Sequence, residues 1–155
     1  MNRLNPRLAD LLESKGVAYR SLHHPADVTS QGTAAHTHTP GQSFAKSVVV
    51  WVDGRYVMAV LPAPMRVDLE KLRKWLNAFE VRLATEEEMA RLFPDCEVGA
   101  EPPFGQLYEV PVYVTPLLAH DRITFNGGSH EEAVQIRYDD FVALAKPSVI
   151  DFVSN

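Results

Sequence analysis

Residues 46–61, KSVVVWVDGRYVMAVL, are the stretch that decides the fold. Two runs rich in β-branched and aromatic side chains flank the dipeptide Asp53-Gly54, which is typical of a two-residue β-hairpin with a type I′ turn. The first run offers no polar face, because valine and tryptophan fill every position from Val48 to Val52. We therefore expect a buried hairpin that is covered on both faces.

Helix signals lie on either side of this hairpin. Helices are predicted to begin at Asn5-Pro6, at Asp68, and at a capping box formed by Thr85 and Glu88. We expect the inner side of the second helix to be formed by Leu69, Leu72, Trp75, Leu76 and Phe79. A final helix is expected over Asp140–Ala145.

The remaining segments predict short strands and a long polar loop. Strands are expected near residues 17–22, 81–84, 110–114, 122–126 and 134–138. Residues 24–43 are small, polar and turn-rich, with at most one short helix near Thr29–Ala35. Strands and helices mix without strict βαβ alternation. We therefore predict a mixed α/β (α+β) protein, a single domain over residues 1–155 built on one curved sheet.

Composition narrows the function classes. The net charge of −5, from 15 basic and 20 acidic residues, gives no overall field for holding nucleic acid and argues against a DNA-binding protein. No apolar run approaches the roughly 20 residues needed to span a bilayer, so no membrane partner is expected. The N-terminus carries no apolar signal core, and a single cysteine, Cys96, fits a reducing compartment. We expect a cytoplasmic protein.

Lys46 is the first candidate for chemistry, because it sits beside an apolar run. Its stem could lie along the core while the ammonium reaches water, as is usual for a lysine at a strand end. Alternatively, the strand could carry the ammonium into a pocket, where it would bind a phosphate or a developing oxyanion. Sequence position alone leaves both interpretations open.

The segment EVGAEPPFG, Glu97 to Gly105, is the second candidate. Its prolines fix φ, and its glycines permit a close backbone approach. Such a loop can hold backbone N–H groups pointing toward an oxyanion or a carbonyl. A plain connecting loop is the alternative.

The segment FNGGSHEE, Phe125 to Glu132, is the third candidate. Gly127-Gly128 turns the chain sharply and presents Ser129 and His130. A Ser–His catalytic pair is rejected, because adjacent residues of an extended chain point in opposite directions and no G-x-S-x-G motif is present. His130 could orient a substrate, or it could be an ordinary surface histidine.

A metal site is not expected. The four histidines of the N-terminal third, His23, His24, His36 and His38, have neither a cysteine pair nor an H-E-x-x-H pattern beside them. Cys96 has no base partner that the sequence identifies, so we interpret it as a loop thiol.

Taken in order, FAKSVVVWVDGRYVMAVLP, GAEPPFG and ITFNGGSHEEAVQI resemble the YbaK/prolyl-tRNA synthetase-associated editing domain family over almost the whole chain. The resemblance implies a barrel-like mixed sheet flanked by helices. It implies catalytic roles for Lys46, Gly99, Ala100 and Glu101. It implies substrate-binding roles for Ser47, Pro102, Pro103, Phe104, Gly128, Ser129 and His130.

The activity implied by the resemblance is hydrolysis of mischarged aminoacyl-tRNA, with alanine or cysteine on tRNA(Pro) as the expected substrates. Lys46 would hold the terminal phosphate or the ester end. The N–H groups near Gly99–Glu101 would hold the ester carbonyl, and His130 would border the amino-acid pocket. No cofactor and no metal are implied. The expected partners are the tRNA acceptor end and an aminoacyl-tRNA synthetase.

Two other function classes stay open. A non-catalytic module that binds an aminoacyl end or a small ligand would share every motif, and a histidine-dependent metal hydrolase ranks last. Ser47, Gly127 and the segment AAHTHTPGQS depart from the pattern of the family, which leaves the identity of the substrate open.

Overall fold

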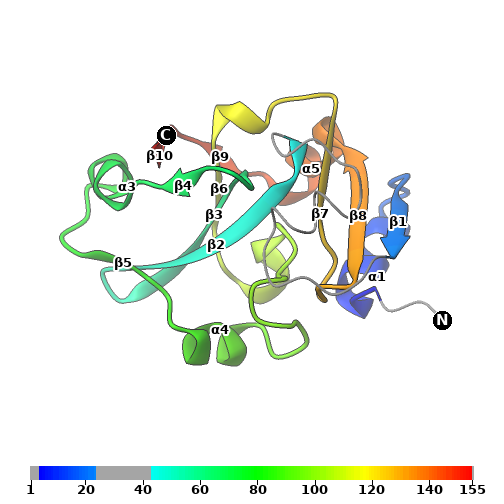
Figure 1. Ribbon diagram of the computed structural model, residues 1–155, viewed down its shortest axis with the longest axis horizontal. Helices are drawn as coiled ribbons and strands as arrows, with labels where there is room; N and C mark the ends of the chain where they lie inside the picture. The colour runs from blue at the N-terminus through cyan, green and yellow to red at the C-terminus, as the bar shows by residue number, and fades with distance from the viewer. Residues whose placement is uncertain (1–3, 24–42, 155) are drawn as a thin grey trace.

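The computed structural model describes residues 4–23 and 43–154. At its centre is the predicted hairpin, formed by β2 (Ala45–Val52) and β3 (Arg55–Pro62) (Figure 1). Asp53 and Gly54 form the two-residue turn with φ values of 48° and 90°. Both angles are positive, as a type I′ turn requires, so the hairpin prediction is confirmed.

The hairpin belongs to a five-stranded sheet in the order β5-β2-β3-β6-β9. The added strands are β5 (Val81–Leu83), β6 (Val112–Val114) and β9 (Ser148–Val149). The β5, β2 and β3 strands pair antiparallel, whereas β3, β6 and β9 pair parallel. The sheet is therefore mixed, as predicted.

Two smaller sheets complete the β structure. One has the order β1-β8-β7, from β1 (Arg20–His23), β7 (Arg122–Asn126) and β8 (Glu132–Arg137). The other pairs β4 (Arg66–Val67) with β10 (Val153–Ser154). The single curved sheet expected from the sequence is thus three separate hydrogen-bonded sheets. One isolated β-bridge, between Phe44 and Thr124, joins the two larger ones.

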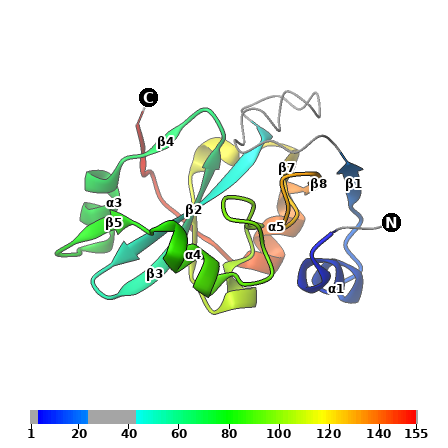
Figure 2. The ribbon, with the colours of Figure 1, turned by 60° about the horizontal axis from the view of Figure 1, so that its bottom comes forward.

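The helices lie around these sheets. They are α1 (Pro6–Ser14), α3 (Leu69–Leu76), α4 (Glu86–Leu92) and α5 (Tyr138–Ala145), with short 3₁₀ turns at Gly105–Tyr108 and Pro116–Leu118. Asn5, Asp68 and Thr85 cap the first three helices, as predicted. Figures 1 and 2 place α1 with β1 at one end of the molecule and α3 with β5 at the other.

The hairpin is covered on both faces, because successive side chains of a strand point to opposite sides. Val49 joins a core cluster with Phe104 and Phe125, and Val50 joins a second cluster with Leu72. The two faces of β2 therefore lead to two different parts of the molecule, which decides where Lys46 and Ser47 point.

One prediction about α3 is wrong. Leu72 is fully buried, but 58% of Trp75 and 94% of Phe79 are exposed. The helix ends at Leu76, where Asn77 takes a left-handed conformation with φ of 52°, so Phe79 lies beyond it. Trp75 lies within the helix but outside the apolar stripe that faces the core.

The expected helix near Thr29–Ala35 lies outside the described residues. Among the residues that the structure does describe, no helix is both long enough and apolar enough to cross a membrane.

Candidate functional site

The structure brings together two of the three segments that the sequence singled out. Below, Gly99–Pro103 is called the glycine–proline loop and Gly128–His130 the histidine turn. The Gly128 N–H donates to the Ala100 carbonyl at 3.0 Å, and the Glu97 N–H donates to the Gly128 carbonyl at 2.8 Å. Segments about thirty residues apart in the chain therefore form one rigid junction.

His130 is held by this junction. Its backbone N–H donates to Glu97 Oε1 at 2.6 Å, and its Nε2 lies 2.8 Å from the Val98 carbonyl oxygen. A carbonyl only accepts, so Nε2 carries the proton, and Nδ1 of the neutral ring is left as an acceptor. This Nδ1 is buried and has no hydrogen-bond partner among the described residues.

Gly99 lies against the imidazole, and its backbone conformation calls for glycine. A Cβ at this position would make an ordinary contact of 3.5 Å with Cε1 of His130, but φ of Gly99 is +88°. Residues with a side chain rarely adopt this conformation. The glycine predicted from the loop pattern is therefore required by the backbone.

Glu101 is the buried acid of the loop. Only 3% of the residue is exposed; Oε2 accepts the Gly99 N–H at 3.2 Å, and Oε1 is buried without a partner among the described residues. Burial raises the pKa of this carboxyl group, and hydrogen bonds from backbone N–H groups oppose the shift only in part.

The predicted role of the loop N–H groups meets an obstacle in this conformation. The Gly99 N–H is used by Glu101, and the Ala100 N–H donates to the Glu97 carbonyl at 3.0 Å. Pro102 and Pro103 have no N–H to offer. Binding of an ester carbonyl by the N–H groups of Gly99 and Ala100 would require both groups to change partner.

Phe104 anchors the loop in the core. It is fully buried, and its ring lies 5.6 Å from that of Phe125 and 5.9 Å from that of Phe141, between centroids. Pro102 and Pro103 are buried as well. The apolar end of the segment thus ties the loop to the core.

The start of α1 supports the histidine turn, which sequence reasoning missed. The Asn5 N–H donates to the Gly127 carbonyl at 2.9 Å, and Asn5 Nδ2 donates to the Asp95 carbonyl at 3.0 Å. Gly128 has φ of +101°, and a Cβ there would lie 2.7 Å from Cβ of Asn5. The capping signal at Asn5 was visible in the sequence, but its contact with the turn was not.

A hollow of about 450 Å³, called the turn hollow below, opens beside this junction. Its lining includes Gly128 and Ser129, and its charged members are the carboxylates of Asp95, Glu97 and Glu131. Of these, Asp95 has a cationic neighbour, Nε of Arg7 at 3.4 Å. The electrostatic field in the hollow favours a cationic group.

Lys46 and Ser47 point to opposite sides of the sheet. Ser47 pairs with Val60 of the first core cluster, and its Oγ is buried without a partner among the described residues. Lys46 pairs with Leu61 of the second cluster, so its side chain leaves the other face of β2. Within the described part of the chain, no hydrogen bond or ion pair joins Lys46 to the glycine–proline loop or the histidine turn.

Lys46 instead lines a small hollow of about 240 Å³, the Lys46 hollow, with Arg66 and the apolar side chains of Val48, Val67, Leu69 and Leu83. Burial, and then the charge of Arg66, lower the pKa of the Lys46 ammonium. Neither cation forms an ion pair with a carboxylate among the described residues. Two unneutralised cations in one apolar hollow form a place for an anion.

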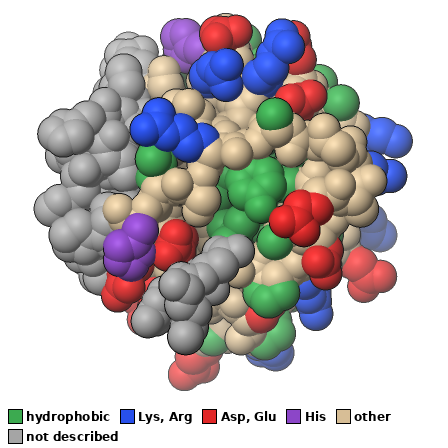
Figure 3. Space-filling model, turned by 90° about the vertical axis from the view of Figure 1, so that its right-hand side faces the viewer, with side chains coloured by type: hydrophobic (Ala, Val, Ile, Leu, Met, Phe, Trp, Pro, Cys, Tyr) green, Lys and Arg blue, Asp and Glu red, His purple; other side chains and the backbone are tan. Residues whose placement is uncertain are grey.

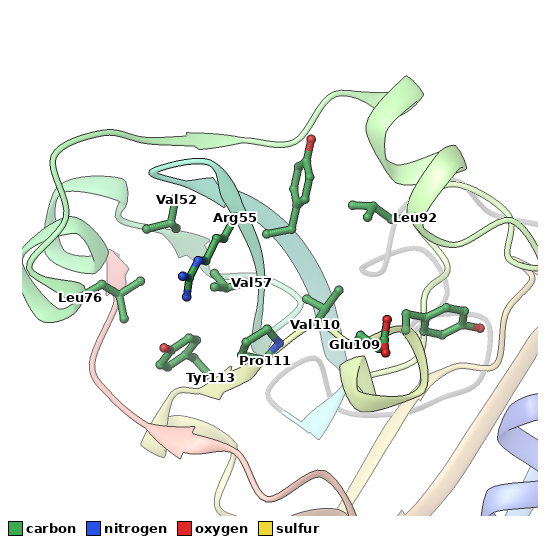
Figure 4. A pocket seen from close by; sticks show the side chains of 11 residues that line it. Val52, Arg55, Val57, Leu76, Leu92, Glu109, Val110, Pro111 and Tyr113 are labelled. Atoms are coloured by element: carbon green, nitrogen blue, oxygen red, sulfur yellow. The ribbon is translucent and has the colours of Figure 1, made fainter.

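A larger hollow lies elsewhere. Figure 4 shows a groove of about 620 Å³ between the hairpin, α4 and the 3₁₀ turn, with Arg55 pointing into it near Leu76 and Glu109 at its other end. It contains no residue that the sequence singled out and few converging polar groups. Size alone does not make it the site.

Metal and cysteine chemistry receive no support from the described residues. They contain no group of three or more His, Cys, Asp or Glu side chains placed to hold a metal ion. Burial raises the pKa of the Cys96 thiol to about 12, so it is not a ready nucleophile. Basic and acidic side chains are interspersed around a central group of hydrophobic ones on the face shown in Figure 3, without a continuous basic field.

Comparison with known proteins identifies the family. A model described as "Aminoacyl-tRNA editing domain" matches residues 24–144, a range that includes Lys46, the glycine–proline loop and the histidine turn. The chain belongs to this family. The resemblance predicted from the three motifs is thereby confirmed.

Two curated relatives are similar to this editing domain. The multifunctional Ser/Thr-tRNA deacylase ProXp-y of Escherichia coli (strain K12) is 29% identical over 152 residues, covering 94% of this chain and 90% of the relative. A proline–tRNA ligase of Geobacillus thermodenitrificans (strain NG80-2) is 32% identical over 96 residues, covering 62% of this chain and 17% of the ligase.

Solved structures confirm the α+β fold of the editing domain. A crystal structure of a candidate trans-editing enzyme for prolyl tRNA synthetase matches with a TM-score of 0.86 and 22% identity, covering 100% of this chain and 99% of the other. A crystal structure of the hypothetical protein APE2540 matches with a TM-score of 0.86 and 19% identity, covering 96% and 99%.

Proposed function

We propose that the protein is a deacylase that hydrolyses the ester bond of mischarged aminoacyl-tRNA. The observation that carries this proposal is that one editing-domain match spans the loop and the turn, which the structure joins by direct hydrogen bonds. The junction leaves buried acceptors on Glu101 and His130 without partners among the described residues. Unpaired buried acceptors of this kind are costly and are found at functional sites.

The reaction needs little from the protein beyond positioning. An aminoacyl ester is already activated, so placing the ester and a water molecule supplies much of the catalysis. Water adds to the ester carbonyl, the bond to the ribose oxygen breaks, and a free amino acid and the tRNA hydroxyl result. By resemblance to the family, the free ribose hydroxyl helps to place the water, and His130 borders the aminoacyl group.

The Lys46 hollow is proposed to bind a phosphate of the tRNA acceptor end. Arg66 and Lys46 would share the phosphate, and the other side chains that line the hollow are apolar and offer no competing anion. Because Lys46 leaves the opposite face of β2 from Ser47, this role concerns the phosphate rather than the ester. It replaces the alternative in which Lys46 holds the ester end.

The proposed substrate is tRNA carrying a small wrong amino acid. The sequence predicted alanine or cysteine on tRNA(Pro), whereas the name of the Escherichia coli relative specifies serine and threonine. These side chains differ by a methyl, a hydroxyl or a sulfur atom, and a pocket separates such groups by only about 1–3 kcal/mol. We further propose that no metal takes part and that a synthetase is a partner for delivery.

The test is a deacylation assay on tRNA(Pro), tRNA(Thr) and tRNA(Ser), each charged with alanine, cysteine, serine or threonine, with and without a chelator. We expect at least one wrong pair to be cleared well above its spontaneous rate, with no effect of the chelator. Saturable binding of these tRNAs without turnover would contradict the proposal and favour a binding module. Activity lost to the chelator would contradict metal independence.

A further inference from the structure

We propose that the Glu101 carboxylate, with Nδ1 of His130, receives the α-ammonium group of the aminoacyl ester and so selects substrates with a free amine. This inference rests on the deacylase function proposed above. It assigns to the Glu101 side chain a role different from that of the loop N–H groups.

The first support is the unpaired oxygen of Glu101. With 3% of the residue exposed, Oε2 is used by the Gly99 N–H, whereas Oε1 is buried and unpartnered among the described residues. A residue that served only to brace the loop would need one oxygen. The second oxygen calls for a donor that arrives with a ligand.

The second support is that His130 offers another acceptor beside the same glycine. The Gly99 N–H binds Glu101, and the Cβ position of Gly99 lies 3.5 Å from Cε1 of His130. The carboxylate and the imidazole therefore flank one residue. With Nε2 donating to Val98, Nδ1 of the neutral ring can only accept. Two acceptors match an ammonium group, which donates and never accepts.

The third support is the sign of the surrounding charge. The turn hollow beside this junction carries Asp95, Glu97 and Glu131 as its charged lining, with Arg7 paired to Asp95. Lys46 and Arg66, which form no ion pair among the described residues, lie in the Lys46 hollow instead. An aminoacyl-tRNA end has the same polarity, with an ammonium group at its tip and phosphates behind it.

Pairing with an ammonium group also suits a buried carboxyl. Burial raises the pKa of Glu101, because the charged form loses its hydration. A bound cation would favour the ionised form and offset that loss. A neutral ligand would leave the carboxylate buried and unpaired, which is the physical basis for rejecting it.

The test compares three esters of the same amino acid skeleton on the same tRNA, with a free α-amine, an N-acetylated amine or an α-hydroxyl group. Each kcat/KM is divided by the spontaneous hydrolysis rate of that ester, at about pH 7, where an α-amino group is mostly protonated and an ordinary imidazole is mostly neutral. The full chain is assayed as wild type, Glu101→Gln and Glu87→Gln. Glu87→Gln removes an exposed carboxylate of α4, away from the turn hollow, and serves as the control for the same chemical change.

We expect the wild type to prefer the free amine over both other esters, and Glu101→Gln to reduce that preference by about tenfold or more. Glu87→Gln should keep the wild-type preference. An equal loss on all three esters in Glu101→Gln would overturn the inference and leave Glu101 as a loop brace. The ratio of kcat/KM values between esters does not depend on the fraction of folded protein, because all three esters are assayed with the same preparation of each variant.

A binding experiment tests this inference independently of the proposed deacylase function. Adenosine carrying the aminoacyl group through a 3′-amide, and its α-hydroxy counterpart, are not cleaved and can be titrated. Tighter binding of the amine form, lost in Glu101→Gln, supports the inference even if no ester turns over. Equal affinities in the wild type would overturn it, whatever the deacylation assay shows.

Discussion

At the scale of single residues, Glu101 couples stability to pH in a defined direction. Burial raises the pKa of its carboxyl group in the folded state. The contribution of this group to stability is therefore fully present below the ordinary glutamate pKa of about 4.3 and is lost as the pH rises through the raised value. Such a penalty at neutral pH fits a functional group retained at a cost in stability.

Glu101→Gln should consequently be more stable than the wild type at neutral pH, because the amide keeps an acceptor for the Gly99 N–H without a buried charge. The difference should shrink toward zero near about pH 4. Urea unfolding at a series of pH values measures it. A stability difference that does not vary with pH would show that the carboxyl group ionises freely in the folded protein.

The environment of Lys46 could be predicted from the sequence only in part. Its place beside an apolar run raised the question of a buried cation, and the alternation along β2 put it opposite Ser47. The neighbour that decides its environment, Arg66, comes from β4, a two-residue strand without a pattern of its own. Tertiary contact, rather than local sequence, supplies the second cation.

At the scale of elements, the junction between α1 and the histidine turn depends on Gly128. Gly128→Ala would combine backbone strain of about 1–2 kcal/mol at φ of +101° with a contact of 2.7 Å to Cβ of Asn5. Gly16→Ala is the matched control, because φ there is +65° but a Cβ would meet nothing within 4 Å. We expect Gly128→Ala to lower the free energy of unfolding by clearly more than Gly16→Ala.

Denaturant unfolding of the two variants measures this difference. Equal losses of unfolding free energy in the two variants would mean that the start of α1 shifts easily to accept the added methyl group and does not hold the histidine turn in place. A greater loss in Gly128→Ala, with weaker deacylation by the remaining folded protein, would place α1 among the supports of the site.

Elements with local signals were predictable and those without were not. The hairpin follows from two β runs and a turn dipeptide, and the capping box of α4 from Thr85 and Glu88. The strands β4, β9 and β10 have two residues each and exist only because a neighbouring strand lies beside them. Trp75 and Phe79 were misplaced because apolar character does not fix where a helix ends.

At the scale of the whole molecule, the chain is acidic, but two of its hollows differ in the sign of their charge. Lys46 and Arg66, which form no ion pair among the described residues, share the Lys46 hollow, whereas the charged side chains that line the turn hollow are carboxylates. The net charge of −5 therefore does not prevent recognition of a short polyanionic end. The motifs predicted the loop and the turn as a pair, but not this separation, which depends on which face of the sheet each side chain leaves.

Lys46→Ala and Arg66→Ala should each raise KM for a charged tRNA with a smaller change in kcat, because a phosphate contact contributes to substrate and transition state alike. Each should also reduce the slope of log(kcat/KM) against log[salt] by about 0.7, the value for one phosphate contact on a single strand. Lys15→Ala, on an exposed lysine at the end of α1, is the control. An unchanged salt slope in Lys46→Ala would contradict the proposal that the Lys46 hollow binds a phosphate.

The most direct measurement of the central claim counts both products of one reaction. Purified protein is mixed in excess with a mischarged tRNA, and the released amino acid and the tRNA that can be recharged are followed together. The account predicts that both appear in equal amounts, at a rate far above spontaneous hydrolysis, for at least one small amino acid. Release no faster than in buffer for every mischarged tRNA tried would contradict it.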